Sequence, residues 1–159
     1  MKTFLIFFIS AVLSIALQAT LFSGVKPDIV LVLVCFYSLK SGQAKGMAYG
    51  VLTGLIIDTI NGYVLGPNII SKAAAGILAV SIRRQFFDWN LFLNTALIFL
   101  LSILDTLIVY ISLEYLTTMS FAERSWGPSV LQVIYTSVVS IILYAVMSKS
   151  FLRTSVFSD

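Results

Sequence analysis

The chain has 159 residues, of which 59% are hydrophobic and only 11% are charged, and its formal net charge is +3. A soluble domain carries about 25% charged residues, so we expect the lipid bilayer to be the main solvent of this chain. The single cysteine and the absence of histidine exclude a disulfide framework, a thiolate metal cluster and the commonest general base.

The sequence predicts a single all-α transmembrane domain over residues 1–159, and its apolar segments are expected to form a bundle of six helices. A helix needs about 20 residues to cross the hydrocarbon core, so the short second and fourth segments must extend into their flanks or lie in locally thinned bilayer. Pro27 and Pro128 suit the first turn of a helix. In chain order, the segments are about 4–22, 27–40, 46–61, 68–82, 90–115 and 128–148.

The first segment resembles a secretory signal peptide in its length and its basic start. Leu17 stands where a cleavage site ending at Ala19 needs a small residue. We therefore expect an uncleaved first span.

The cations indicate an orientation for these spans. Cytoplasmic loops carry an excess of lysine and arginine, and a cytoplasmic N-terminus places seven cations inside and two outside, with Lys72 within a span. This bias alternates through six spans and predicts that both termini are cytoplasmic. The inside set is Lys2, Lys40, Lys45, Arg83, Arg84, Lys149 and Arg153, and the outside set is Lys26 and Arg124.

Glycine recurs every four residues along the third segment, at Gly42, Gly46, Gly50 and Gly54. Each step turns about 40° around a helix, so these residues form a slanting groove. Small residues let two helix backbones approach closely. Packing within the bundle is the favoured interpretation, and docking of a partner's helix is the alternative.

Polar residues form stripes on three segments, and these stripes are expected to face the inside of the bundle. The second segment is apolar all round, so one of its faces is expected to meet lipid or a foreign helix. The stripes are Ser10, Ser14 and Gln18; Asn94, Asp105 and Ser112; and Gln132, Thr136 and Ser140.

Three ionisable residues lie within or beside the predicted spans. Asp58 and Lys72 flank a short turn between antiparallel helices, so they should lie at similar depth and form an ion pair, although backbone donors could also satisfy Asp58. Asp105 lies near mid-membrane and needs a partner or a proton. Fixing helix register is the favoured role, with a proton relay or a substrate site as alternatives. Because the sequence has no nucleophile elbow, phosphate loop or metal constellation, we expect neither an enzyme nor a cofactor.

Two stretches carry a family resemblance: "VKPDIVLVLV" (25–34) and "GMAYGVLTGLIIDTINGYVLGPN" (46–68). They resemble the rod shape-determining protein MreD family in a basic-Pro-Asp start, spaced glycines, Gly-Leu-x-x-Asp and a later Leu-Gly. Lys26 stands where arginine is usual, and Asn61 where serine is usual. The matching positions are Lys26-Pro27-Asp28, Gly54-Leu55 with Asp58, Asn61-Gly62 and Leu65-Gly66.

The resemblance implies a non-enzymatic, multi-pass scaffold of the cell-elongation machinery in the bacterial inner membrane, with no nucleic-acid partner. It implies association with MreC, in an assembly with MreB, RodA and a class B penicillin-binding protein that serves peptidoglycan synthesis. The fold is expected to resemble the substrate-binding membrane components of energy-coupling-factor (ECF) transporters. The alternative function is therefore a small-molecule-binding transporter component. The candidate structural or partner-binding residues are Lys26, Pro27, Asp28, Gly46, Gly50, Gly54, Asp58, Asn61, Gly62, Gly66, Lys72 and Asp105.

Overall fold

The computed structural model describes residues 2–21, 24–62, 64–85, 90–116 and 126–147, and over these residues the chain is all helical. Each predicted apolar segment is a helix, and the bounds agree with the prediction to within three residues. The helices are α1 (Lys2–Leu21), α2 (Ile29–Ser41), α3 (Gln43–Asn61), α4 (Pro67–Arg83), α5 (Leu91–Leu116) and α6 (Trp126–Met147).

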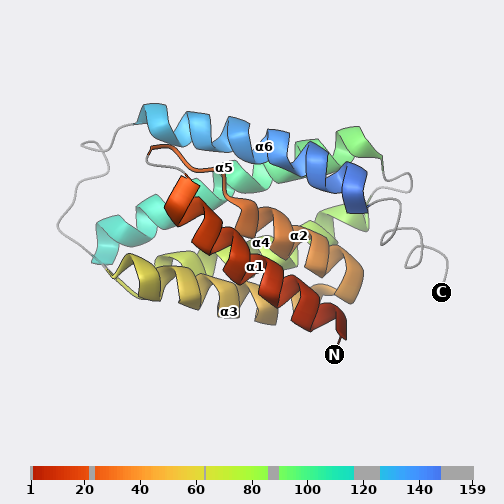
Figure 1. The fold of residues 1–159 in the computed structure, drawn as a ribbon, viewed down its shortest axis with the longest axis horizontal. Coiled ribbons are helices and arrows are strands. Elements are labelled where there is room, and N and C mark those ends of the chain that lie inside the picture. The colour runs from red at the N-terminus through yellow and green to blue at the C-terminus, as the bar shows by residue number, and fades with distance from the viewer. Residues whose placement is uncertain (1, 22–23, 63, 86–89, 117–125, 148–159) are drawn as a thin grey trace.

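Consecutive helices run in opposite directions along the long axis of the bundle (Figure 1). The N-terminus of α1, the α2–α3 connection and the end of α4 therefore share one end, which we call the basic end. Lys26 precedes α2 at the opposite end. This alternation is the one that the six-span prediction requires. The described cations of the basic end are Lys2, Lys40, Lys45, Arg83 and Arg84.

The helix α2 is the centre of the bundle, and every side chain from Val30 to Leu39 is buried. It contacts α1, α3, α4, α5 and α6. The expectation that one face of this segment meets lipid or a foreign helix is therefore wrong. A helix that is apolar all round is one that is covered all round, and here the cover comes from the same chain.

The same helix is too short to cross a bilayer alone. Its 13 residues span about 20 Å, against about 30 Å of hydrocarbon. The prediction that Pro27 lies in the first turn of this helix is wrong, because Asp28 is the N-cap and the helix begins only at Ile29. Non-helical backbone is tolerated at this depth where protein covers it, and Pro27 is buried.

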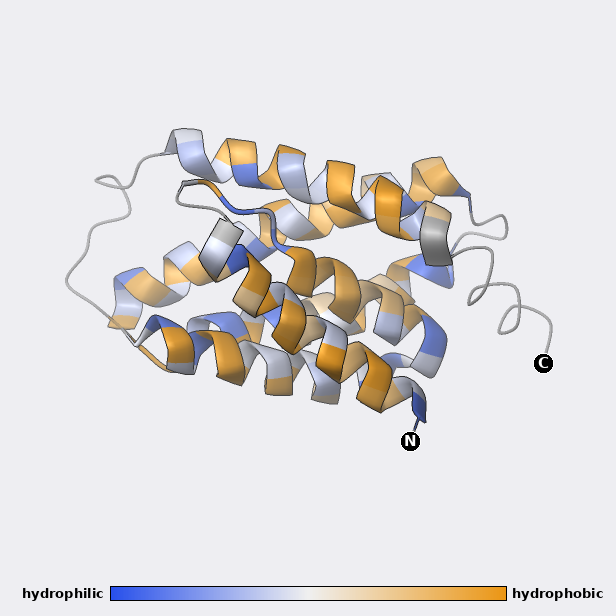
Figure 2. Ribbon diagram, viewed as in Figure 1, coloured by the Kyte–Doolittle hydropathy of each residue, from blue (hydrophilic) through white to orange (hydrophobic). Residues whose placement is uncertain are grey.

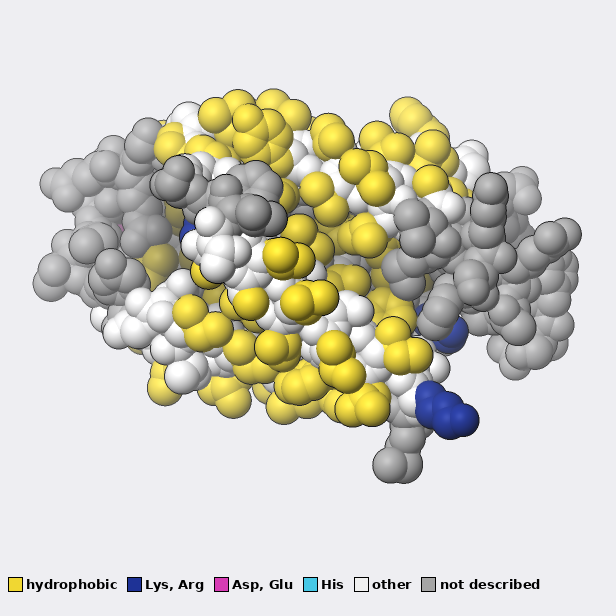
Figure 3. All heavy atoms as spheres, viewed as in Figure 1, with side chains coloured by type: hydrophobic (Ala, Val, Ile, Leu, Met, Phe, Trp, Pro, Cys, Tyr) yellow, Lys and Arg dark blue, Asp and Glu magenta, His cyan; other side chains and the backbone are white. Residues whose placement is uncertain are grey.

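Three helices of the described chain, α1, α5 and α6, are long and apolar enough to cross a membrane. Apolar side chains cover much of the visible surface (Figure 3), and apolar residues recur along every helix of the ribbon (Figure 2). The helices α3 and α4 are less apolar because they carry the glycines, Asp58, Ser71 and Lys72. Six complete spans stay a prediction.

The glycine groove of α3 packs within the chain. A Cβ on Gly54 would lie 2.7 Å from the Cα of Ile69, and one on Gly50 would lie 2.6 Å from the carbonyl carbon of Lys72. Gly46 faces the side chain of Ser38 on α2 in the same way. The backbone of α4 and a side chain of α2, not a partner's helix, therefore fill this groove.

Aromatic contacts hold α1 against the centre. The hydroxyl of Tyr49, on α3, is buried and donates to the backbone carbonyl of Phe7 at 2.8 Å. Phe4, Phe7 and Tyr37 pack around that ring at centroid distances of 4.6–6.5 Å. This cluster fixes the basic-end half of α1, and the other half lies beside the polar cavity described below.

Candidate functional site

Lys72, on α4, is the centre of a buried ion cluster. Its side chain is 1% exposed, and its Nζ lies 2.5 Å from Asp28 Oδ2 and 2.7 Å from Asp105 Oδ1. The hydroxyl of Ser71 also donates to Asp105 Oδ1. The cluster therefore joins the start of α2, the first turns of α4 and the middle of α5.

The sequence around Asp28 explains how a charged residue reaches this depth. Asp28 is the N-cap of α2, and its Oδ1 accepts the backbone N–H of Leu31 at 2.8 Å. Its own backbone N–H donates to Thr136 Oγ1 of α6 at 2.8 Å. Because α2 is short, its N-cap lies inside the bundle, and the remaining carboxylate oxygen is free to meet Lys72.

The cluster holds two carboxylates and one ammonium. With all three groups ionised it carries one net negative charge. Charges in a low-dielectric interior are stable only when they are paired and hydrogen-bonded, and each of the three has at least one partner of opposite charge within 2.7 Å. The arrangement therefore fixes the positions of three helices relative to one another.

The predicted ion pair between Asp58 and Lys72 is wrong. Asp58 Oδ2 accepts the backbone N–H groups of Gly66 and Ile69 at 2.9 and 3.2 Å. Its Oδ1 accepts the backbone N–H of Asn68 at 3.1 Å and the Nδ2 of the same residue at 2.7 Å. The backbone donors that were the alternative partner are thus the ones it uses.

The geometry of the α3–α4 turn is the reason. The glycines bring α3 against α4 so closely that Asp58 lies opposite the first turn of α4, where backbone N–H groups lack partners within the helix. Lys72 lies further along α4 and extends toward α2 and α5. Gly62 and Gly66, with φ of 69° and 132°, permit the turn itself.

The polar stripes are buried in part. Asn94 and Asp105 of α5 and Thr136 and Ser140 of α6 are buried. The other five stripe residues are half-buried: Ser10, Ser14, Gln18, Ser112 and Gln132. Asp105 is the stripe residue with ionic partners. Both polar side-chain atoms of Asn94 lie buried without a hydrogen-bond partner in the described part of the chain.

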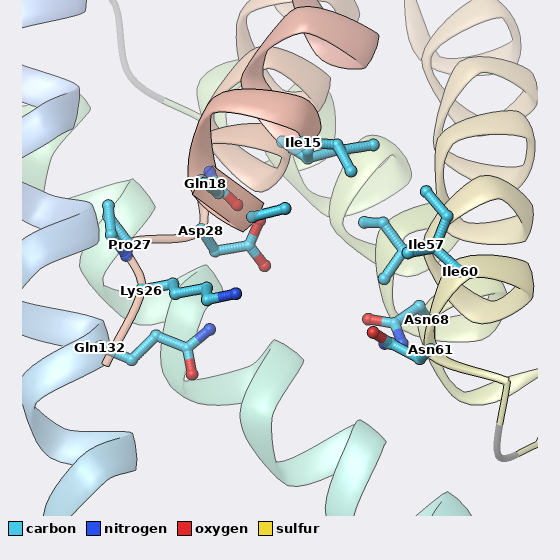
Figure 4. A pocket seen from close by; sticks show the side chains of 12 residues that line it. Ile15, Gln18, Lys26, Pro27, Asp28, Ile57, Ile60, Asn61, Asn68 and Gln132 are labelled. Atoms are coloured by element: carbon cyan, nitrogen blue, oxygen red, sulfur yellow. The ribbon is translucent and has the colours of Figure 1, made fainter. Parts of the chain in front are cut away.

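A polar cavity of about 270 Å³ lies beside Asp28, away from the basic end (Figure 4). Lys26 and Asp28 point into it from the segment before α2, and Asn61 and Asn68 face them from α3 and α4. Ile57 lies beside these amides. The full lining is Ile15, Gln18, Ala19, Lys26, Pro27, Asp28, Val30, Ile57, Ile60, Asn61, Asn68 and Gln132.

The candidate residues fall into three neighbouring groups. Lys26, Pro27, Asp28 and Asn61 line the cavity, and Asp28 connects them to Lys72 and Asp105. Gly46, Gly50 and Gly54 lie in the α3 groove, and Asp58, Gly62 and Gly66 form the α3–α4 turn. Within the described residues, no group of three or more His, Cys, Asp or Glu side chains is arranged to hold a metal ion.

Sequence patterns did not identify Asp28 as the partner of Lys72, nor Ser71 as a donor to Asp105. A signal for the first was present, because an aspartate directly before an apolar run indicates an N-cap. Combined with the shortness of the segment, it would have placed Asp28 inside the bundle. No comparable local signal marks Ser71, whose role depends on how α4 faces α5.

The family model of the rod shape-determining protein MreD matches residues 1–154. No curated protein and no solved structure is significantly similar to the chain. Because the family match covers nearly the whole sequence, the chain belongs to the MreD family of rod shape-determining membrane proteins, a family not known for enzymes.

Proposed function

We propose that this MreD-family protein is a non-enzymatic scaffold of the cell-elongation machinery and that it associates directly with MreC in the bacterial inner membrane. The wider assembly includes MreB, RodA and a class B penicillin-binding protein. In this proposal all six helices cross the bilayer, with both termini in the cytoplasm.

The observation that carries the proposal is that the buried ionisable side chains find their ionic and hydrogen-bond partners inside the bundle. Lys72 and Asp105 are paired inside the bundle, and Asp58 accepts four hydrogen bonds within the chain. A scaffold needs a rigid body whose outer surface is available. The internal glycine packing and the ion cluster supply rigidity, and they leave the exterior to lipid and partners.

The outer surfaces of α1 and α6 suit contact with another transmembrane helix. Leu13 is 58% exposed on α1, and Ile142 is 59% exposed on α6. Helix association in lipid depends on packing and on hydrogen bonds rather than on a hydrophobic drive. The half-buried Ser14 and Ser137 lie among these apolar side chains.

A transporter component that binds a small molecule is the second candidate function, and the polar cavity favours it. That function predicts association with energising ATPase subunits. The scaffold predicts association with MreC, so the two functions differ in the partner that is recovered.

The test is capture of the full chain from membranes of its native host in mild detergent, followed by mass spectrometry of the eluate. Recovery of MreC in stoichiometric amounts supports the scaffold. Recovery of ATPase subunits without MreC would overturn it.

A site-directed version of this experiment maps the surface. The one cysteine of the chain, Cys35, is fully buried, so single exposed cysteines can be labelled over a low background. Leu13→Cys and Ile142→Cys would carry a photo-reactive maleimide on α1 and α6. MreC should crosslink to one helix in preference to the other, and equal trace crosslinking at both positions would argue against direct contact.

A further inference from the structure

The cavity beside α2 holds two groups of opposite charge that do not bind each other. Lys26 points into the cavity (Figure 4) and makes no hydrogen bond or ion pair with any residue in the described ranges. Asp28 faces the same space while its oxygens bind Leu31 and Lys72. A carboxylate has about four acceptor positions, so Asp28 keeps the capacity to accept from a further donor.

Charge accounting indicates what would complement this space. The cluster of Asp28, Lys72 and Asp105 carries one net negative charge when all three groups are ionised, and Lys26 carries one positive charge. A simple anion would be attracted by Lys26 but repelled by the negative cluster. A simple cation would be attracted by the cluster but repelled by Lys26. A molecule with one charge of each sign complements both walls.

The remaining lining offers hydrogen bonds and an apolar wall. The carboxamides of Asn61, Asn68 and Gln132 also line the cavity, and a carboxamide has both donors and an acceptor. The Nδ2 of Asn68 already donates to Asp58. Ile15 and Ile57 supply apolar surface. Small-molecule sites have this composition, in which a few polar groups fix orientation within an apolar pocket.

The volume indicates the size of molecule that fits. The cavity has a volume of about 270 Å³. Drug-sized ligands occupy pockets of about 300–1,000 Å³. The cavity therefore suits a small metabolite.

We propose that this cavity binds a zwitterionic small molecule of the α-amino-acid class. Its carboxylate lies at Lys26 and the amide of Gln132, its ammonium lies toward Asp28 and the carboxamide oxygens, and a short apolar side chain rests on Ile15 and Ile57. The site does not depend on the scaffold role, because a scaffold and a transporter component can each carry it.

Isothermal titration of the full chain in nanodiscs tests the site, with leucine as the probe because it is a small α-amino acid with an apolar side chain. Two analogues, 4-methylpentanoate and 3-methylbutylamine, each lack one of its charges. Leucine is expected to bind with saturation, and each analogue at least about tenfold more weakly, the loss of one charge-assisted hydrogen bond. No saturable binding of leucine, or equal binding of either analogue, would overturn the proposal.

Matched variants assign the binding to this cavity. Lys26→Gln removes the unpaired ammonium, and Ala19→Phe adds bulk to the lining of the cavity; each should weaken leucine binding at least tenfold. Lys45→Gln, an exposed lysine at the basic end, and Ala16→Phe, one turn earlier on α1 and outside the lining, should leave it unchanged. Asp28 stays unaltered because it caps α2 and binds Lys72. Equal effects of the variants and their controls would place the binding elsewhere.

Discussion

The side chain of Lys72 is almost fully buried, and its neighbours explain why a charge is tolerated there. It contacts two carboxylates from different helices, so its charge is more than neutralised. The depth in the membrane that the sequence predicts for Lys72 correctly indicated that this residue needs an acidic partner. The sequence patterns selected Asp58 because a short turn places it at a similar depth on the neighbouring antiparallel helix. Pairing in three dimensions also depends on which way each side chain faces.

Replacing Lys72 by glutamine should destabilise the fold by about 3–5 kcal/mol, because two carboxylates then lie side by side without a cation. Asp105→Asn should cost less, since it leaves Asp28 and Lys72 as a balanced pair. Reversible unfolding of each variant in detergent micelles measures the difference. Lys45→Gln, at an exposed position, is the control and should change stability by less than about 0.5 kcal/mol. Equal costs for Lys72→Gln and Asp105→Asn would show that charge balance does not govern the cluster.

Asp58 acts as a cap from a neighbouring helix. Asp58→Ala leaves the first backbone donors of α4 without their acceptor and should cost about 2–4 kcal/mol. A double-mutant cycle with Asn68→Ala should show coupling, because the Asn68 side chain donates from Nδ2 to this carboxylate at 2.7 Å. The cycle with Lys72→Gln should be additive within about 0.5 kcal/mol. Strong coupling to Lys72 instead would restore the ion pair that the structure lacks.

At the scale of the helices, α2 shows what sequence patterns cannot predict, which is whether lipid or protein surrounds a helix. Hydropathy located the segment, but a uniformly apolar helix reads the same whether lipid or protein surrounds it. The glycines of α3 were more informative. Small residues at a fixed spacing indicate that another helix packs closely, whichever helix that is. Their partners on α4 and α2 could not be named, because that choice depends on how consecutive helices turn.

Gly50→Ala should destabilise the protein by about 1–3 kcal/mol, because the new methyl group meets the backbone of Lys72, which cannot move aside like a side chain. Gly127→Ala is the matched control. Gly127 lies in the first turn of α6, and a Cβ added there would have no heavy atom of another part of the described chain within 4 Å. Its replacement should therefore be neutral or slightly stabilising. The measurement is the melting temperature of each variant in thermal unfolding. Identical melting temperatures would mean that α3 and α4 are less tightly packed than the structure indicates.

At the scale of the whole molecule, composition and cation distribution predicted an apolar six-helix bundle with a basic end, and both features are present. The cavity was not predicted. It forms where the segment before α2 meets the helices α1, α2, α3, α4 and α6. No sequence pattern encodes the meeting of six separate elements. Stripe residues such as Gln18 and Gln132 were expected inside the bundle, yet only the assembled fold places them on one cavity.

The orientation of the bundle is the property of the whole chain that most affects these proposals. Alternating helices place the described cations mainly at one end, and the positive-inside rule assigns that end to the cytoplasm. A reporter fused after Asp159 should therefore report the cytoplasm, and a reporter inserted near Ser120 should report the outside. With the basic end in the cytoplasm, the cavity lies toward the outer surface, within reach of solutes from that side. Both reporters on one side of the membrane would contradict the six-span arrangement, and exchange of the two sides would invert it and turn the cavity toward the cytoplasm.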